Sequence, residues 1–216
     1  ITTMQVQNAN DEEFTNIFIK TGRIQYFIMA LILTGFILFG REFINLIWLG
    51  AEYDAAYIIT CILMISTIVP LIQNVGLNII QAKNQYKYRV KVLIIFAIFN
   101  IIISIILVKS IGGIGAAIGT ALSQFLGQVI FMNRFYYKKT HIDIPKFWKE
   151  IFKISIPMII LFIITIVIKN YLKVNTSIKV LIGILLYTIL YLIIIYKFAM
   201  NSEEKNIIKK IKRIKG

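Results

Sequence analysis

Six long stretches of this sequence carry no charged residue, and this feature restricts the possible folds more than any other. They are residues 24–40, 55–82, 92–108, 110–133, 154–168 and 180–196. A helix needs about 20 apolar residues to cross the roughly 30 Å of bilayer hydrocarbon, and flanking lysines extend the reach of shorter stretches. The alternation of a membrane β-barrel is absent. The predicted fold class is therefore all-α, a polytopic membrane protein with six transmembrane helices.

The composition agrees with a membrane protein. The 216 residues are 58% hydrophobic and 16% charged, whereas a soluble domain is typically about 45–50% apolar and about 25% charged. So few polar residues cannot cover a water-soluble surface, and the abundance of Ile, Leu, Val and Phe excludes intrinsic disorder. The single cysteine, Cys61, excludes a disulfide scaffold.

The distribution of basic residues predicts the orientation. The net charge is +14, but the lysines and arginines lie between apolar stretches and form no patch that would bind nucleic acid. With six helices, most of the 24 lysines and arginines fall on the side that also holds both termini. Positive residues favour the cytoplasm. We therefore expect a multi-pass protein of the cytoplasmic membrane with both termini cytoplasmic.

Two regions are expected along the chain. Residues 1–200 form the six-helix transmembrane part, and residues 201–216 form a basic tail. In the tail, isoleucines 207, 208, 211 and 214 share one helical face opposite lysines, which favours an interfacial helix on anionic lipid. A solvated, frayed tail is equally consistent with the pattern. Because the chain starts at Ile1, we expect a C-terminal portion of a longer protein, with Met4 as the alternative start.

The second apolar stretch holds the most informative polar residues. Asn74, Asn78 and Gln81 follow the spacing i, i+4, i+7 and share one helical face, with Gln73 beside it and Pro70 one turn earlier. Proline is expected to kink this helix. Amides in hydrocarbon need hydrogen-bonding partners. The four amides are therefore candidates for a substrate cavity wall, and contacts between helices are the alternative.

The fourth apolar stretch combines small and polar residues. Gly115, Gly119, Ser123 and Gly127 recur every four residues, which predicts close packing against another helix. Gln124 and Gln128 lie on an adjacent face and are candidate cavity-lining residues.

Charged residues cluster beside the first turn on the predicted outer side. Arg41, Glu42, Glu52 and Asp54 are candidates for an outer vestibule, and a solvated loop is the alternative. No charged residue interrupts the six stretches, so we expect no ion or proton relay within them. Cys61 and His141 have no neighbouring ligands for a metal. No cofactor, metal site or catalytic residue is predicted, and the protein is not expected to be an enzyme.

Several segments resemble those of a known family when taken in order. They are GREFI at 40–44, WLGAEY at 48–53, PLIQN at 70–74, IQAKNQY at 80–86 and GGIGAAIGT at 112–120. Together they resemble bacterial polysaccharide-biosynthesis flippases of the Wzx type, which belong to the multidrug/oligosaccharidyl-lipid/polysaccharide exporter superfamily. The resemblance covers roughly residues 11–134.

This resemblance implies a function and a set of partners. It implies a two-lobed helical exporter, of which this chain supplies the last six helices. It implies translocation of undecaprenyl-linked oligosaccharide across the cytoplasmic membrane for surface polysaccharide. The implied partners are membrane lipid, the undecaprenyl-linked glycan, a polysaccharide polymerase and glycosyltransferases, without nucleic acid.

Three alternatives remain at the level of sequence. A multidrug cation exporter of the same superfold would need an acidic residue in its cavity, and the six stretches contain none. A membrane-embedded glycosyltransferase or polymerase would need loop carboxylates or arginines, and the loop before the fifth stretch offers Asp143 and Glu150. A non-catalytic scaffold of a synthesis complex is the third alternative.

Overall fold

A computed structural model describes residues 10–172 and 176–207, and these are almost entirely helical. The elements in chain order are α2 (Asp11–Phe43), η1 (Ile44–Trp48), η2 (Ala51–Tyr53), α3 (Asp54–Ile72), α4 (Val75–Ala82), α5 (Tyr86–Ile111), α6 (Gly113–Gln124), η3 (Phe125–Met132), α7 (Asn133–Lys139), α8 (Ile144–Leu172), α9 (Ser177–Ile194) and η4 (Ile195–Ala199). The segments η1, η3 and η4 are π-helical, and η2 is a short 3₁₀ turn.

The six predicted transmembrane helices are confirmed. Six helical segments in the described part of the chain are long and apolar enough to cross a membrane: Asp11–Trp48, Asp54–Ile72, Tyr86–Ile111, Gly113–Lys139, Ile144–Tyr171 and Ser177–Ala199. The helices are longer than the uncharged stretches of the sequence, because capping and packing decide where a helix ends and the presence of a charge does not. At the start of α2, Asn10 Oδ1 accepts from the Glu13 amide at 2.8 Å and the Glu13 carboxylate accepts from the Asn10 amide at 3.1 Å. The protein is an all-α, multi-pass membrane protein.

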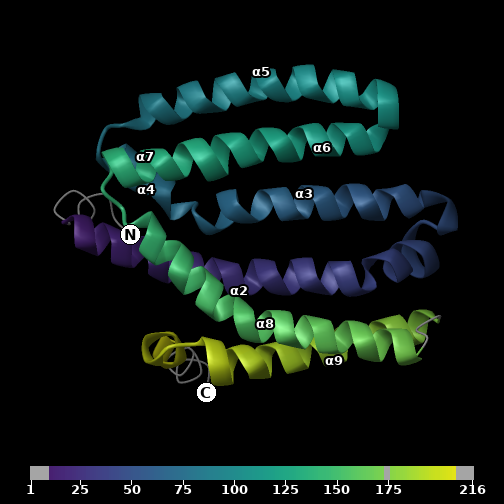
Figure 1. Cartoon of the computed structure of the whole chain (residues 1–216). Helices are drawn as coiled ribbons and strands as arrows, with labels where there is room; N and C mark the ends of the chain where they lie inside the picture. Colours follow the sequence, from purple (N-terminus) through teal and green to yellow (C-terminus); the bar gives the residue numbers. More distant parts are fainter. Residues whose placement is uncertain (1–9, 173–175, 208–216) are drawn as a thin grey trace.

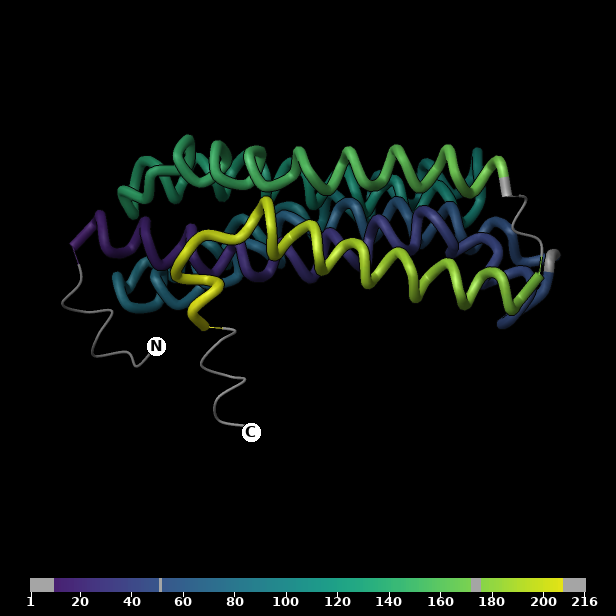
Figure 2. The backbone as a smooth tube through the Cα atoms, turned by 90° about the horizontal axis from the view of Figure 1, so that it is seen from below, coloured from purple at the N-terminus to yellow at the C-terminus, as the bar shows by residue number. Residues whose placement is uncertain are grey.

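The helices lie roughly side by side, with α2 between two groups of them (Figure 1). Figure 1 shows α5, α6, α3 and α2 in that spatial order, with α8 and α9 beyond α2, and shows successive turns alternating between the two ends. Figure 2, turned by 90° from Figure 1, shows α8 and α9 apart from each other, with α8 at the top and α9 below it. Both of these helices pack against α2. The long α2 is therefore the element that joins the α3–α6 layer to the α8–α9 pair.

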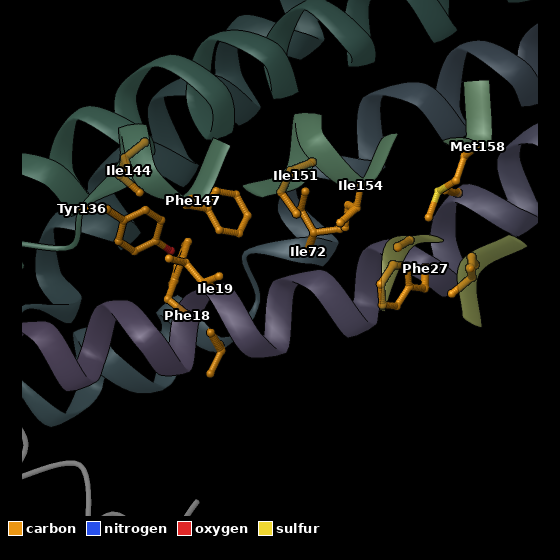
Figure 3. Packing of buried hydrophobic residues seen from close by; sticks show 14 of the residues in the cluster. Phe18, Ile19, Phe27, Ile72, Tyr136, Ile144, Phe147, Ile151, Ile154 and Met158 are labelled. Atoms are coloured by element: carbon orange, nitrogen blue, oxygen red, sulfur yellow. The ribbon is translucent and has the colours of Figure 1, made fainter. Parts of the chain in front are cut away.

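The apolar core extends along α2, and one dense part of it lies where α8 begins and crosses α2. Phe18 of α2 contacts Tyr136 and Phe147 edge-to-face, with ring centroids 5.4 and 4.9 Å apart (Figure 3). A Cβ atom at Gly22 would overlap the Phe147 ring, so glycine lets α8 approach α2 here. The basic segment 146–153 is the first part of continuous α8, and Phe147 and Ile151 bury its apolar side.

The second apolar stretch differs from the prediction. The prediction was one kinked helix over residues 55–82, but α3 ends at Ile72 and α4 begins at Val75. Pro70 donates no backbone hydrogen bond and crowds the preceding turn, and the helix breaks within one turn after it. The turn at Gln73 and Asn74 leaves α4 as a separate short helix.

The tail is described only as far as residue 207. Residues 202–207 are helical, and Asn201 begins this helix with a reciprocal cap, since its Oδ1 accepts from the Glu204 amide at 2.9 Å. The remainder of the predicted amphipathic tail, 208–216, lies outside the described residues.

Candidate functional site

A cavity of about 350 Å³ lies between α5 and the α6–η3 segment. We name it the polar cavity after the five polar side chains in its otherwise apolar lining. Pro70 of α3 also lines it. Its polar lining consists of Asn100, Thr120, Ser123, Gln124 and Gln128, and its apolar lining includes Val92, Leu93, Phe96 and Ala97. The structure thus brings Gln124 and Gln128, two of the predicted cavity residues, to one hollow within the membrane-spanning helices.

The hydroxyl groups in the polar cavity already have partners, whereas the two glutamines do not. The Ser104 hydroxyl donates to Asn100 Oδ1 at 2.9 Å, and the Thr120 hydroxyl reaches the same oxygen at 3.4 Å. Ser123 donates to the Gly119 carbonyl at 2.9 Å. Within the described residues, Gln124 and Gln128 form no side-chain hydrogen bond with protein and are half-buried. Their amides are available to a ligand.

The π-helical segment η3 begins directly after Gln124. π-Helical turns inside α-helices are uncommon and occur often at functional sites, because they change the direction of the following side chains. Here the irregular turn includes Gly127 and Gln128, which both line the polar cavity.

The stripe of small residues packs against α5. A Cβ atom at Gly115 would overlap the backbone of Leu107, and one at Gly119 would overlap the backbone and hydroxyl of Ser104. At Gly127, a Cβ atom would lie 3.0 Å from the Phe96 ring. The two helices therefore touch closely along Gly115 and Gly119, and the polar cavity opens farther along the same seam.

The predicted amide face of the second stretch is divided in the structure. Asn74, Asn78 and Gln81 are exposed on α4 and the turn before it, and none of them lines the polar cavity. Gln73 is 4% exposed, and its Nε2 donates to Asn133 Oδ1 at 2.7 Å. The helix break explains this division, because it turns Gln73 inward towards the start of α7.

Three of the four predicted vestibule residues form ion pairs between helices. Arg41 donates to both carboxylate oxygens of Asp54 at 2.6 Å and so joins α2 to α3. Glu42 pairs with Lys169 at 2.6 Å and joins α2 to α8. Glu52 is exposed. Arg41, Glu42 and Asp54 are therefore engaged in contacts between helices.

Sequence reasoning missed a buried ionic network. Arg23 of α2 pairs with Glu150 of α8 and with Glu204, which follows η4. Asn201 and Glu204 have the spacing of a helix cap, a signal that was visible in the sequence. The partners of Arg23 were not, because no local pattern relates residues so far apart. No group of three metal-ligating side chains occurs within the described ranges.

Comparison with known proteins places this arrangement in a family. The family described as "Lipid II flippase MurJ" matches residues 3–186, which include five complete transmembrane helices and part of α9. Neither a curated protein nor a solved structure gave a significant match. The matched range holds both the polar cavity and the seam of small residues beside it. The chain belongs to the MurJ family of lipid II flippases.

Proposed function

We propose that this chain is part of a flippase that moves an undecaprenyl-linked saccharide precursor from the cytoplasmic to the outer leaflet. The observation that carries this proposal is the polar cavity at membrane depth. A saccharide headgroup is too polar to enter hydrocarbon alone, so its carrier must offer hydrogen-bonding groups between helices. Gln124 and Gln128 supply such groups.

The chemistry of the polar cavity fits the sugar part of such a substrate. An amide side chain has both donors and an acceptor, which complement sugar hydroxyl groups. No charged side chain is among the residues that line this cavity. A diphosphate would favour lysine or arginine, so this cavity suits the neutral saccharide, and the diphosphate would be bound elsewhere.

Two precursors are candidates for the substrate. Lipid II is the first, because the family match covers residues 3–186. The repeat unit of a surface polysaccharide is the second, because the ordered segments between residues 40 and 120 resemble polysaccharide flippases. In the second case, a polysaccharide polymerase and glycosyltransferases would be partners. The proposed localisation is the cytoplasmic membrane, with both termini of the chain in the cytoplasm.

Depletion of the protein in its own cells distinguishes the two precursors. If lipid II is the substrate, lipid II should accumulate in the inner leaflet and peptidoglycan synthesis should stop. If the polysaccharide unit is the substrate, surface glycan should disappear while peptidoglycan synthesis continues. Unchanged leaflet distributions of both precursors would refute the proposal.

The cavity is tested by single substitutions. Gln124→Leu and Gln128→Leu should lower the flipping rate about tenfold at unchanged membrane abundance, because each removes hydrogen bonds to the headgroup at similar volume. Asn78→Leu is the matched control, since this amide is exposed on α4 and does not line the cavity. A loss of flipping in Asn78→Leu alone would locate the binding surface on α4 instead.

A further inference from the structure

Arg23 forms an unusually complete set of buried hydrogen bonds near the start of α2. Its side chain is 5% exposed. Its Nε and Nη2 donate to the two oxygens of Glu204 at 2.7 and 3.0 Å, and its Nη1 donates to Glu150 at 2.8 Å. Nη2 also donates to the carbonyl oxygen of Ala199 at 2.9 Å. One guanidinium therefore binds two carboxylates and the end of η4.

This network joins three parts of the chain at one point. Glu150 lies in the first turns of α8, and Ala199 and Glu204 lie just beyond α9. Glu204 is held in place from its own side, because its Oε2 accepts from the Asn201 amide at 2.8 Å. Both members of the α8–α9 pair are thus tied to α2 through the same side chain.

Most of the remaining contact between the α8–α9 pair and the rest of the protein also involves α2. Within the described residues, α8 and α9 pack mainly on α2, although α7 contacts the start of α8 and Trp148 of α8 lines a cavity with residues of α3 and α6. At the opposite end, Lys169 of α8 pairs with Glu42 and donates to the Leu38 carbonyl, both of α2. The α8–α9 pair is therefore attached mainly to α2, with an ion pair at each end. Between these ends Tyr187 donates to Thr34, Tyr191 donates to the Phe27 carbonyl, and Tyr26 is hydrogen-bonded to Ser155.

The ion pairs at the two ends differ in burial, because Lys169 and Glu42 are 19% and 22% exposed whereas Arg23 is 5% exposed. Glu204 is 2% exposed in its side chain, so Arg23 and Glu204 have given up almost all contact with water. If the helices separate, both charges regain their hydration, which offsets much of the lost attraction. An ion pair with hydrogen bonds also requires a defined geometry, whereas apolar surfaces can slide past one another and stay buried. A buried network of this kind suits a contact that opens and closes.

We propose that Arg23, Glu150 and Glu204 form a latch at this end of the molecule. The latch holds the α8–α9 pair closed against α2, and the pair leaves α2 as one unit when the latch breaks. This inference goes beyond the proposed function and does not depend on the identity of the substrate.

Hydrogen–deuterium exchange on the full chain in lipid nanodiscs tests the latch without a transport assay. Glu204→Gln keeps the side-chain shape and removes the charge. It should speed amide exchange at least about tenfold in residues 144–158 and in 191–207 together, and leave α5 and α6 unchanged. Lys20→Met is the matched control, because it removes the exposed Lys20–Glu203 pair beside the latch and should change neither region. Faster exchange confined to residues 200–207 would overturn the proposal, since Arg23 would then only anchor the tail.

Exchanging the charges of Arg23 and Glu204 distinguishes loss of the latch from misfolding of a single variant. Arg23→Glu should loosen both regions, and Arg23→Glu combined with Glu204→Arg should restore slow exchange, because the new arginine can pair with both carboxylates. Failure of the double variant to restore protection, with protein abundance unchanged, counts against the latch.

A reversible cross-link tests whether opening is needed for transport. In a Cys61→Ala background, cysteines are introduced as Lys20→Cys and Glu203→Cys, where the native side chains pair at 2.9 Å. A cleavable thiol cross-linker between them should abolish flipping, and reduction should restore it. Wild-type flipping by cross-linked protein would overturn the latch. Absence of flipping in the uncross-linked protein would refute the proposed function, and the exchange experiment would still decide the latch.

Discussion

Gln73 and Asn74 are adjacent amides with opposite environments. Gln73 is buried and bonded to Asn133, whereas Asn74 is exposed at the start of α4. A buried amide without a partner loses its hydration and gains nothing in return. The Gln73–Asn133 pair therefore holds the break between α3 and α4 against the start of α7.

A double-mutant cycle measures this pair. Gln73→Leu and Asn133→Leu should each lower the free energy of unfolding by about 1–3 kcal/mol, since each leaves one amide unpaired. The double variant should lose less than the sum of the two, because no orphaned amide remains. Thermal unfolding in detergent provides the measurement, and Asn74→Leu is the control that should unfold like the wild type. Additive losses would show that the two amides do not interact.

At the scale of elements, α5 and α6 pack backbone against backbone. Gly115 and Gly119 bring the backbone of α6 against Leu107 and Ser104 of α5. Without a hydrophobic driving force in lipid, this close packing must supply much of the attraction between the two helices. The polar cavity begins beyond this contact, so the contact positions its two walls.

Adding one methyl group tests the contact. Gly115→Ala should lower the free energy of unfolding by about 1–3 kcal/mol, because the Cβ atom would meet backbone that cannot move aside. Gly113→Ala is the matched control on the same helix, since its Cβ atom would lie 3.4 Å from a flexible Ile59 methyl. Equal stability of the two variants, compared by thermal unfolding in detergent, would mean that α5 and α6 are not held this closely.

At the scale of the whole molecule, ion pairs show which turns lie at the same end of the protein. Lys83 pairs with Asp11 at 2.7 Å and donates to the Thr140 carbonyl at 2.8 Å, which places the starts of α2, α5 and α8 together. Arg41, Asp54 and Lys169 lie at the other end, near the turns after α2 and α8. The excess of lysine and arginine at the first end predicts that it faces the cytoplasm.

Cysteine labelling in a Cys61→Ala background checks the orientation. Exposed positions Lys87→Cys and Lys138→Cys should resist a membrane-impermeant maleimide in intact cells and react after permeabilisation. Glu52→Cys and Lys109→Cys should react in both conditions. Labelling of Lys87→Cys in intact cells would invert the proposed topology.

The amino-acid sequence by itself determined how many helices cross the membrane, because the length of an uncharged stretch is a local property read directly against the bilayer thickness. The spacing of Gln124 and Gln128 beside the glycine stripe was equally local, and it was enough to single them out as candidates. Only the tertiary structure decided that Gln73 turns inward to Asn133, 60 residues away, and that Arg23 meets Glu150 and Glu204, 127 and 181 residues away. Such partners depend on how α2, α7, α8 and the segment after α9 pack, and helical periodicity carries no information about which faces of distant helices will meet.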